Sequence, residues 1–123
     1  MMLVDTSVWV DHLRRGDDEL AAALLAGQVL VHPWVSGELA CGTLQNRGQF
    51  LDLLRLLPMP PVAGEDEVLF FIERFALMGR GIGYVDVHLL ASARLAGVRL
   101  WTRDKRLAVV ANALGMAYTE VRH

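Results

Sequence analysis

Short, largely apolar runs alternate along the chain with segments in which apolar residues recur at helical spacing. The runs at residues 2–4, 29–31 and 98–102 are typical of buried strands, and residues 116–121 predict a weaker last strand. Short apolar strands that alternate with helices form parallel sheets with helices on both faces. The pattern therefore predicts an α/β fold built on a parallel sheet.

The segments between these runs carry the start and stop residues of helices. Thr6 and Ser7 are good N-caps, Pro33 suits the first residue of a helix, and Gly97 is a typical C-cap. The acids at residues 17–19 favour the start of a further helix. One predicted helix ends near Gly16 and one near Gly27, others span residues 33–44, 49–57, 64–78, 84–96 and 105–114, and the proline-rich residues 59–62 predict a loop or an edge strand.

Length and composition fit one domain with a large core. Of the 123 residues, 54% are hydrophobic, and this excess indicates an apolar surface that a partner covers. Cys41 is the only cysteine, which excludes an intrachain disulfide, and its helical context favours a core position. Because no signal peptide and no membrane span is predicted, we expect a soluble protein of the cytoplasm.

The net charge of −2 provides no overall basic footprint for nucleic acid. This counts against a nucleic-acid-binding protein, but less so if bound cations neutralise several of the acids. Basic residues also cluster at residues 14–15 and 99–106, where ordinary solvated charge is the simpler interpretation.

Four acidic residues interrupt otherwise apolar or tightly patterned segments. They are Asp5, Glu38, Asp86 and Asp104. A carboxylate among apolar neighbours is costly unless something compensates its charge. Asp5 and Asp104 follow predicted strands, whose carboxyl ends share one edge of a parallel sheet, whereas Glu38 and Asp86 lie on predicted helices. We therefore expect one acidic pocket that holds one or two divalent cations such as Mg²⁺, which can activate water against a phosphodiester.

Each of these acids also has a simpler interpretation. Asp5 could cap the helix that follows it, and Asp104 could equally start the last helix. Glu38 could pair with an arginine, and Asp86 could cap the helix after the glycine-rich residues 79–83. Each alternative is reasonable alone, but all four holding together is a weaker hypothesis than one shared pocket.

Aromatic residues and histidines give weaker signals. Trp9, Trp34 and Trp101 lie beside the candidate site segments, where core packing is a more frequent role than base stacking. The histidines do not have the spacing of a metal-ligand pair.

The four segments that carry the acids resemble those of the PIN-domain ribonucleases, and most of all the VapC-type toxins of bacterial and archaeal toxin–antitoxin pairs. These segments are LVDTSVWVDHLR, SGELACG, GRGIGYVDVHLLASA and VRLWTRDKRL. One departure is Val87, where the family usually has a small residue after its third acid. The resemblance covers nearly the whole chain and implies a single domain, 1–123, with a three-layer α/β/α fold.

The resemblance also implies a chemistry and partners. It implies cleavage of single-stranded regions of RNA that depends on Mg²⁺ or Mn²⁺, with Asp5, Glu38, Asp86 and Asp104 as the catalytic acids and metal ligands. It further implies a homodimer and a cognate antitoxin whose C-terminal segment wraps the toxin. We expect the hydroxyls of Thr6, Ser7 and Thr102 to position waters or phosphate oxygens, and Arg103 or Lys105 to contact the RNA backbone.

Two rival functions remain open from the sequence. A phosphoacceptor receiver domain would share the length, the α/β alternation and the acids, but it needs an acceptor aspartate at the end of a central strand. The mid-chain candidate, Asp52, lies instead in the helical pattern FLDLLRLL. A catalytically inactive PIN scaffold that only binds a partner is the second rival, and the four intact acids argue against it.

Overall fold

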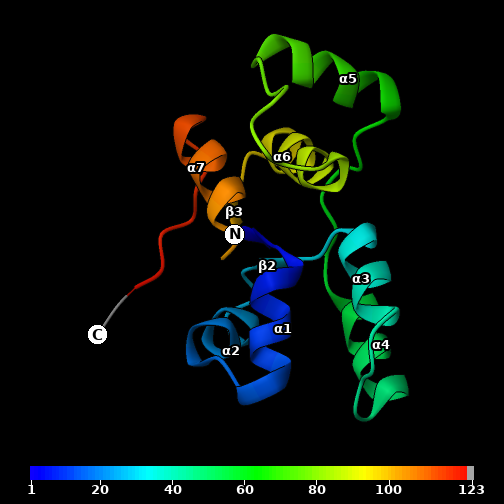
Figure 1. Cartoon of the computed structure of the whole chain (residues 1–123). Coiled ribbons are helices and arrows are strands. Elements are labelled where there is room, and N and C mark those ends of the chain that lie inside the picture. The colour runs from blue at the N-terminus through cyan, green and yellow to red at the C-terminus, as the bar shows by residue number, and fades with distance from the viewer. Residues whose placement is uncertain (122–123) are drawn as a thin grey trace.

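A parallel sheet forms the centre of the molecule in the computed structural model, which describes residues 1–121 (Figure 1). Strand β1 (Met2–Val4) lies between β2 (Val29–Leu30) and β3 (Arg99–Trp101). Both pairs are parallel, and Leu3 of the central strand is in register with Leu30 and Leu100. The predicted parallel sheet is confirmed.

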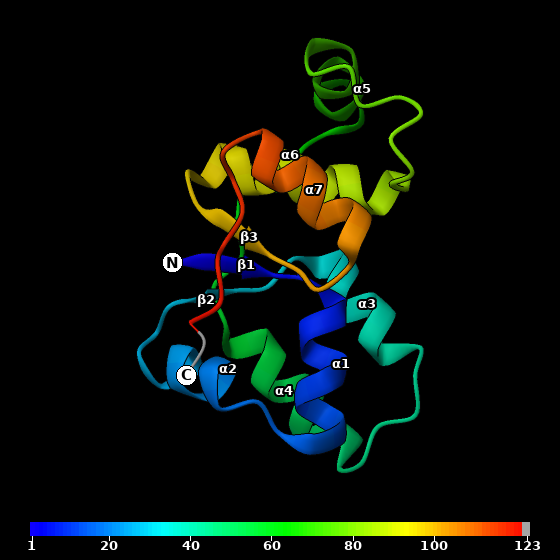
Figure 2. The same ribbon diagram turned by 60° about the vertical axis from the view of Figure 1, so that its left-hand side comes forward.

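Helices cover both faces of this sheet, as Figures 1 and 2 show from two directions. On one side lie α1 (Thr6–Arg15), α2 (Asp18–Leu25), α3 (Pro33–Ala40) and α4 (Arg47–Leu56). On the other side lie α6 (Tyr84–Ala96) and α7 (Lys105–Ala113), with α5 (Glu65–Arg74) packed on the outer side of α6. The three-layer α/β/α architecture follows, as expected from apolar strands that must be covered on both faces.

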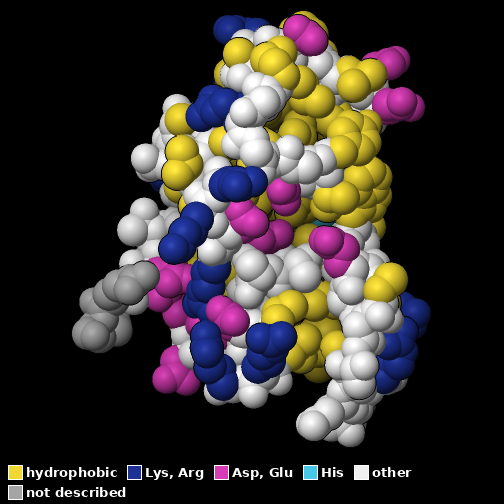
Figure 3. Space-filling model, in the orientation of Figure 1, with side chains coloured by type: hydrophobic (Ala, Val, Ile, Leu, Met, Phe, Trp, Pro, Cys, Tyr) yellow, Lys and Arg dark blue, Asp and Glu magenta, His cyan; other side chains and the backbone are white. Residues whose placement is uncertain are grey.

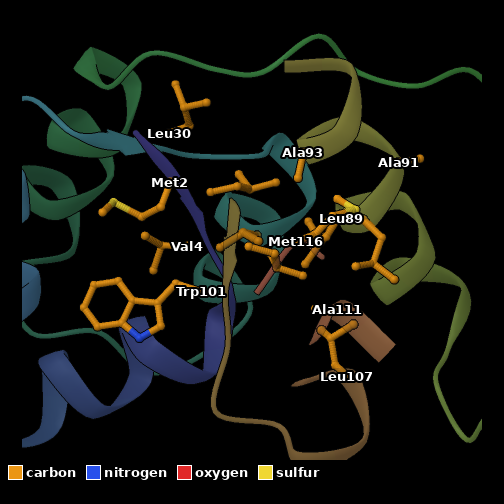
Figure 4. Packing of buried hydrophobic residues seen from close by; sticks show 14 of the residues in the cluster. Met2, Val4, Leu30, Leu89, Ala91, Ala93, Trp101, Leu107, Ala111 and Met116 are labelled. Carbon is orange, nitrogen blue, oxygen red and sulfur yellow. The ribbon is translucent and has the colours of Figure 1, made fainter. Parts of the chain in front are cut away.

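The core extends over both faces of the sheet, and Figure 4 shows its part between the sheet and α6 and α7. Residues 87–93 of α6 are all buried, because the helix is enclosed by the sheet on one side and by α5 on the other. Leu89 of α6 and Leu107 of α7 are fully buried together with Trp101 of β3. Among the residues that the structure describes, no helix is long and apolar enough to cross a membrane.

Two helices end earlier than their sequence pattern predicts. Helix α3 ends at Ala40 rather than near residue 44, and the Arg47 guanidinium donates hydrogen bonds to the carbonyl oxygens of Ala40 (2.6 Å) and Gly42 (3.3 Å). These carbonyls are satisfied from outside the helix, so the helix can stop there. Helix α5 ends at Arg74 rather than residue 78, because Ala76 adopts a left-handed conformation with φ of 51°.

Two further predictions need correction. The last strand predicted at residues 116–121 is reduced to one bridge between Leu100 and Ala117, because only Met116 and Tyr118 exchange backbone hydrogen bonds with Leu100. Cys41 is exposed at the C-terminal end of α3 and does not belong to the core. The early end of α3 leaves this residue outside the buried face.

Two histidines are buried beside the start of α3. His32 is fully buried, and its Nδ1 accepts a hydrogen bond of 3.0 Å from the backbone N–H of Trp34, which caps the helix. Within residues 1–121, neither Nε2 of His32 nor either ring nitrogen of the buried His88 has a hydrogen-bond partner. Burial and, to a smaller extent, the proximity of His88 lower the pKa of His32 to about 4. His32 is therefore neutral at physiological pH.

We expect the protein to lose stability as the pH falls from about 6.5 to 4. The unfolded chain protonates His32 near pH 6.5, whereas the folded chain resists protonation until about pH 4, so acid favours the unfolded state in this window. The full contribution is about 3 kcal/mol. His32→Asn keeps an acceptor for the Trp34 N–H, so thermal melts across this range should show a shallower pH dependence for the variant. Parallel profiles for the two proteins would contradict the prediction.

Candidate active site

Asp5 emerges from the carboxyl end of the central strand and is almost completely buried, with 7% of its surface exposed. It occupies the N-cap position of α1, but its side chain makes no capping hydrogen bond. Its Oδ2 instead accepts hydrogen bonds of 2.7 Å from the hydroxyls of both Ser7 and Thr102. The alternative that Asp5 serves as a helix cap is therefore wrong.

The two hydroxyls that hold Asp5 are themselves fixed by the backbone. Ser7 Oγ accepts a hydrogen bond of 2.9 Å from the N–H of Arg103, and Thr102 Oγ1 accepts one of 3.1 Å from the N–H of Asp104. Since each hydroxyl carries one proton, accepting from the backbone directs that proton to Asp5. This chain of bonds ties the start of α1 to the β3–α7 connection and fixes the orientation of the Asp5 carboxylate.

Glu38 lies on α3 with its side chain exposed, and its Oε1 accepts a hydrogen bond of 2.9 Å from the hydroxyl of Thr6. No lysine or arginine of the described chain forms an ion pair with it. The alternative of an arginine partner is therefore not what the structure shows. The hydroxyls of Thr6, Ser7 and Thr102 all bond to carboxylates, so their immediate role is to orient these acids.

Asp86 and Asp104 each cap a helix, as the simpler interpretation predicted. Asp86 Oδ2 accepts a hydrogen bond of 3.1 Å from the N–H of Gly83 before α6, and Asp104 Oδ1 accepts one of 3.0 Å from the N–H of Leu107 in α7. A carboxylate can accept several hydrogen bonds or bind a cation with its second oxygen. Capping and membership of the acidic pocket are therefore compatible.

The pKa of Asp86 is influenced by the other three acids. Burial raises the pKa of the Asp86 carboxyl, the hydrogen bond from Gly83 opposes this, and the negative charges of Asp5, Asp104 and Glu38 raise the pKa further. Figure 3 shows acidic side chains gathered at the centre of one face, with basic side chains on one flank and hydrophobic ones on the other. The acids from four separate segments thus lie close enough to influence one another electrostatically.

The donor chemistry of this pocket fits a hard cation. All four groups are carboxylates, and Mg²⁺ and Mn²⁺ prefer oxygen ligands. Within the described residues, no three His, Cys, Asp or Glu side chains are close enough to enclose one ion by themselves. Mg²⁺ commonly binds through one or two carboxylates and keeps several waters, so the separation of these acids suits a hydrated ion better than an all-protein cage.

Arg103 points away from this pocket. Its guanidinium forms ion pairs with Asp11 (2.9 Å), Asp17 and Glu120 (2.6 Å), and these contacts raise its pKa although burial opposes them. This side chain is therefore engaged within the protein rather than free to contact an RNA backbone. Lys105, the other predicted RNA contact, is exposed in the first turn of α7.

Sequence reasoning missed a basic residue beside the site. The side chain of Arg106 lies against Gly81, so that a Cβ added to this glycine would be 2.9 Å from it. Gly81 also has a φ of +80°, which favours glycine there. Gly81 belongs to the loop that leads into α6 and Asp86. The signal in the sequence was the glycine-rich loop, but its contact with residue 106 depends on the tertiary fold.

The sequence is similar to known proteins over nearly its whole length. The sequence model of the PIN domain matches residues 2–113. Two proteins named Ribonuclease VapC32, from the CDC 1551 / Oshkosh and H37Rv strains of Mycobacterium tuberculosis, are each 48% identical to the chain over 121 residues. Each match covers 98% of this chain and 98% of the relative. With Asp52 in helix α4, exposed and paired with Arg55, the receiver-domain alternative is wrong.

Proposed function

Because the chain belongs to the PIN-domain family, we propose that it is a metal-dependent endoribonuclease toxin of the VapC type, which cleaves single-stranded regions of RNA. The observation that carries this proposal is the pocket of Asp5, Glu38, Asp86 and Asp104 at the carboxyl edge of the sheet. Both related ribonucleases match over nearly their whole length, which supports the same activity for this chain.

In this proposal the four acids would hold a hydrated Mg²⁺ or Mn²⁺, one or two of them directly and the others through its waters. The ion would activate water and neutralise charge on the phosphodiester. Ser7 and Thr102 hold the Asp5 carboxylate in one orientation through Oδ2, and Thr6 does the same for Glu38. Such preorientation lowers the cost of assembling the site. Lys105, and Arg106 beside the loop before α6, are placed to neutralise RNA phosphates.

The proposal is tested by incubating the purified protein with structured RNA in Mg²⁺, in Mn²⁺ and in EDTA. We expect cuts within single-stranded loops in either metal and none in EDTA. Undiminished cleavage in EDTA would overturn the metal mechanism. Absence of cleavage in both metals would favour the inactive-scaffold alternative.

Neutralising one acid should stabilise the metal-free protein. Asp86 is partly buried and faces three like charges, which the unfolded chain can separate. We expect Asp86→Asn to raise the stability of the metal-free protein by about 0.5–2 kcal/mol, since an asparagine oxygen can still accept from the Gly83 N–H. The measurement is a thermal melt of both proteins without metal.

Added metal should stabilise the wild type more than the Asp86→Asn variant. Mn²⁺ that binds the folded state stabilises it by mass action, and the variant, which has one ligand fewer, should gain less. Asp66→Asn, in the first turn of α5, is the matched control and should melt like the wild type with and without Mn²⁺. If Asp86→Asn melts lower without metal and Mn²⁺ shifts both proteins equally, the four acids do not share a pocket.

We further propose that the protein forms a homodimer and binds a cognate antitoxin in the cytoplasm. A groove of about 970 Å³ between α1, α2, α3 and α4 is mainly lined by apolar side chains and reaches Thr6 and Glu38 at the acidic pocket. Leu25, Leu53 and Leu56 are exposed on it. An apolar partner segment could occupy this groove, and an arginine on it could pair with the acids.

Light scattering tests the dimer. A clean monomer at protein concentrations on the order of tens of micromolar would contradict it. For the partner, Leu56→Glu should abolish capture of the cognate antitoxin without affecting RNA cleavage. Unchanged capture would exclude this groove as the antitoxin site.

A further inference from the structure

We propose that Trp34 and Tyr84 form a platform on which a base of the RNA substrate stacks beside the acidic pocket. This inference rests on the ribonuclease function proposed above and adds a subsite for the nucleobase. Both side chains are exposed to solvent.

The rings of Trp34 and Tyr84 both pack against the buried side chain of His88. The centroid of the Trp34 ring lies 4.0 Å from that of His88, and the centroid of the Tyr84 ring lies 4.6 Å from it on another side. His88 is buried, with 4% exposed, whereas Trp34 is 37% and Tyr84 44% exposed. The indole therefore packs part of its surface against His88 and leaves the rest open to a ligand.

The two exposed rings are close together but not parallel. Their centroids are 6.2 Å apart and their planes are inclined by 54°, so they do not stack on one another. Both rings pack against His88, and the centroid of the Trp34 ring also lies 6.0 Å from that of the buried His32 in an edge-to-face arrangement. A ring that is fixed before binding loses little conformational freedom when a base stacks on it.

The two rings lie on the same helices as two of the four acids. Trp34 precedes Glu38 by four residues on α3, so the two side chains lie on the same face of that helix one turn apart. Tyr84 is the first residue of α6, the helix that also carries Asp86, so both residues lie in the first turn of that helix although on different faces. Figure 3 shows hydrophobic side chains directly beside the central acidic group, on the flank opposite the basic residues.

This position favours a nucleobase over other occupants. Aromatic rings beside a site that binds phosphates are the usual means of holding single-stranded nucleic acid, because every base offers a π face. An RNA strand whose phosphate lies at the acids would bring a neighbouring base within reach of α3 and α6. Stacking of this kind is tolerant of sequence, so the platform would select unpaired bases rather than one particular base.

The test compares two probes that differ only in their bases: oligoadenylate, and a ribose–phosphate oligomer of the same length without bases. Binding is measured in the Asp5→Asn background, which prevents cleavage, for the parent protein and for Trp34→Leu. Leucine keeps an apolar cover over His88 but offers no π face. We expect Trp34→Leu to weaken oligoadenylate binding by about 5- to 100-fold and to leave the baseless oligomer unaffected.

Two further variants control for damage to the fold. Tyr84→Phe keeps a ring and should bind oligoadenylate like the parent, whereas Tyr84→Leu should lose affinity. Phe70→Leu changes an aromatic residue of α5 that is 70% exposed, and it should leave both probes unaffected. Thermal melts with Mn²⁺ should shift equally for Trp34→Leu and for a protein with Trp34 intact, because the metal ligands are untouched.

The outcomes separate this proposal from the proposed function. If Trp34→Leu, with Asp5 intact, cleaves RNA with unchanged KM and kcat, the platform is refuted while the ribonuclease function stands. Equal weakening of both probes would mean that Trp34 supports the fold or the backbone contacts and would refute base stacking. If Trp34→Leu dissociates a dimer without changing RNA affinity, the rings belong to an interface between two copies. If RNA binds with the expected base preference but is never cut, the proposed function fails and the platform stands.

Discussion

Replacing Asp5 by asparagine is expected to reduce RNA cleavage by about 100-fold or more, because metal-assisted catalysis commonly contributes several kcal/mol. An amide is neutral and is a poor substitute for an anionic ligand of a divalent cation. The fold should survive, since asparagine has the same shape and its Oδ1 can still accept the hydroxyls of Ser7 and Thr102. Cleavage of structured RNA in Mn²⁺, measured alongside a thermal melt, checks both expectations.

Asp52→Asn is the matched control for this substitution. Asp52 is an exposed aspartate on α4, paired with Arg55 at 3.0 Å and far in sequence from the four acids. The same chemical change there should leave cleavage intact and change stability by no more than a surface ion pair is worth, about 1 kcal/mol. An Asp5→Asn protein that cleaves RNA as fast as the control would show that Asp5 is not a metal ligand.

The position of the acids at one edge of the sheet could be predicted, because a buried parallel strand allows polar residues only after its carboxyl end. Strands β1 and β2 are wholly buried and apolar, β3 is exposed only at Arg99, and the residue after the central strand is Asp5. The carboxyl ends of parallel strands lie at the same edge of a sheet, so the sequence alone could predict that acids following these strands lie near one another. The helix limits were less predictable, since α3 ends where the side chain of Arg47 reaches back to it.

Local sequence could not separate a helix cap from a pocket acid. Asp5, Asp86 and Asp104 all stand at helix starts, and the sequence around each one fits a cap. In the structure, Asp86 and Asp104 make capping hydrogen bonds while Asp5 makes none. The difference depends on Thr102, which reaches Asp5 from the other end of the chain, and such long-range contacts are invisible to a local pattern.

The exposure of Trp34 and the contacts of Arg103 escaped prediction for the same reason. The expectation that Trp34 packs in the core is right for the face on His88 but wrong for the 37% of its surface that is exposed. Arg103 stands among other basic residues in TRDKRL, which favoured a solvated or RNA-binding role. Its actual partners come from α1, the start of α2 and the C-terminal segment.

Arg103→Met is expected to destabilise the protein by about 2–3 kcal/mol, somewhat less than the loss of one partner from a fully buried ion pair. The guanidinium is 26% exposed and joins three carboxylates, so its removal leaves Asp11, Asp17 and Glu120 facing one another without a cation. Although burial raises the pKa of Asp17, hydrogen bonds from Leu20 and Arg103 bring it below its usual value, so this carboxylate is charged at pH 7.

The same change should loosen the active site. The backbone N–H of Arg103 donates to Ser7, which holds Asp5, so an unanchored β3–α7 connection no longer fixes that carboxylate. We expect Arg103→Met to weaken Mn²⁺ binding, measured as a smaller shift of the thermal melt with metal, by about 10-fold or more in affinity. Arg103→Lys should recover only part of either loss, because an ammonium cannot reach three carboxylates in the geometry of a guanidinium.

Arg15→Met is the control for the loss of an arginine that pairs with Asp11. The Arg15 side chain is 74% exposed and lies 3.6 Å from Asp11, so its removal should cost no more than about 1 kcal/mol and should leave the Mn²⁺ shift unchanged. Melts of the three proteins with and without Mn²⁺ decide the matter. If Arg103→Met melts like Arg15→Met, the three-carboxylate cluster contributes little to stability. If its Mn²⁺ shift equals that of the wild type, Asp5 is held without help from Arg103.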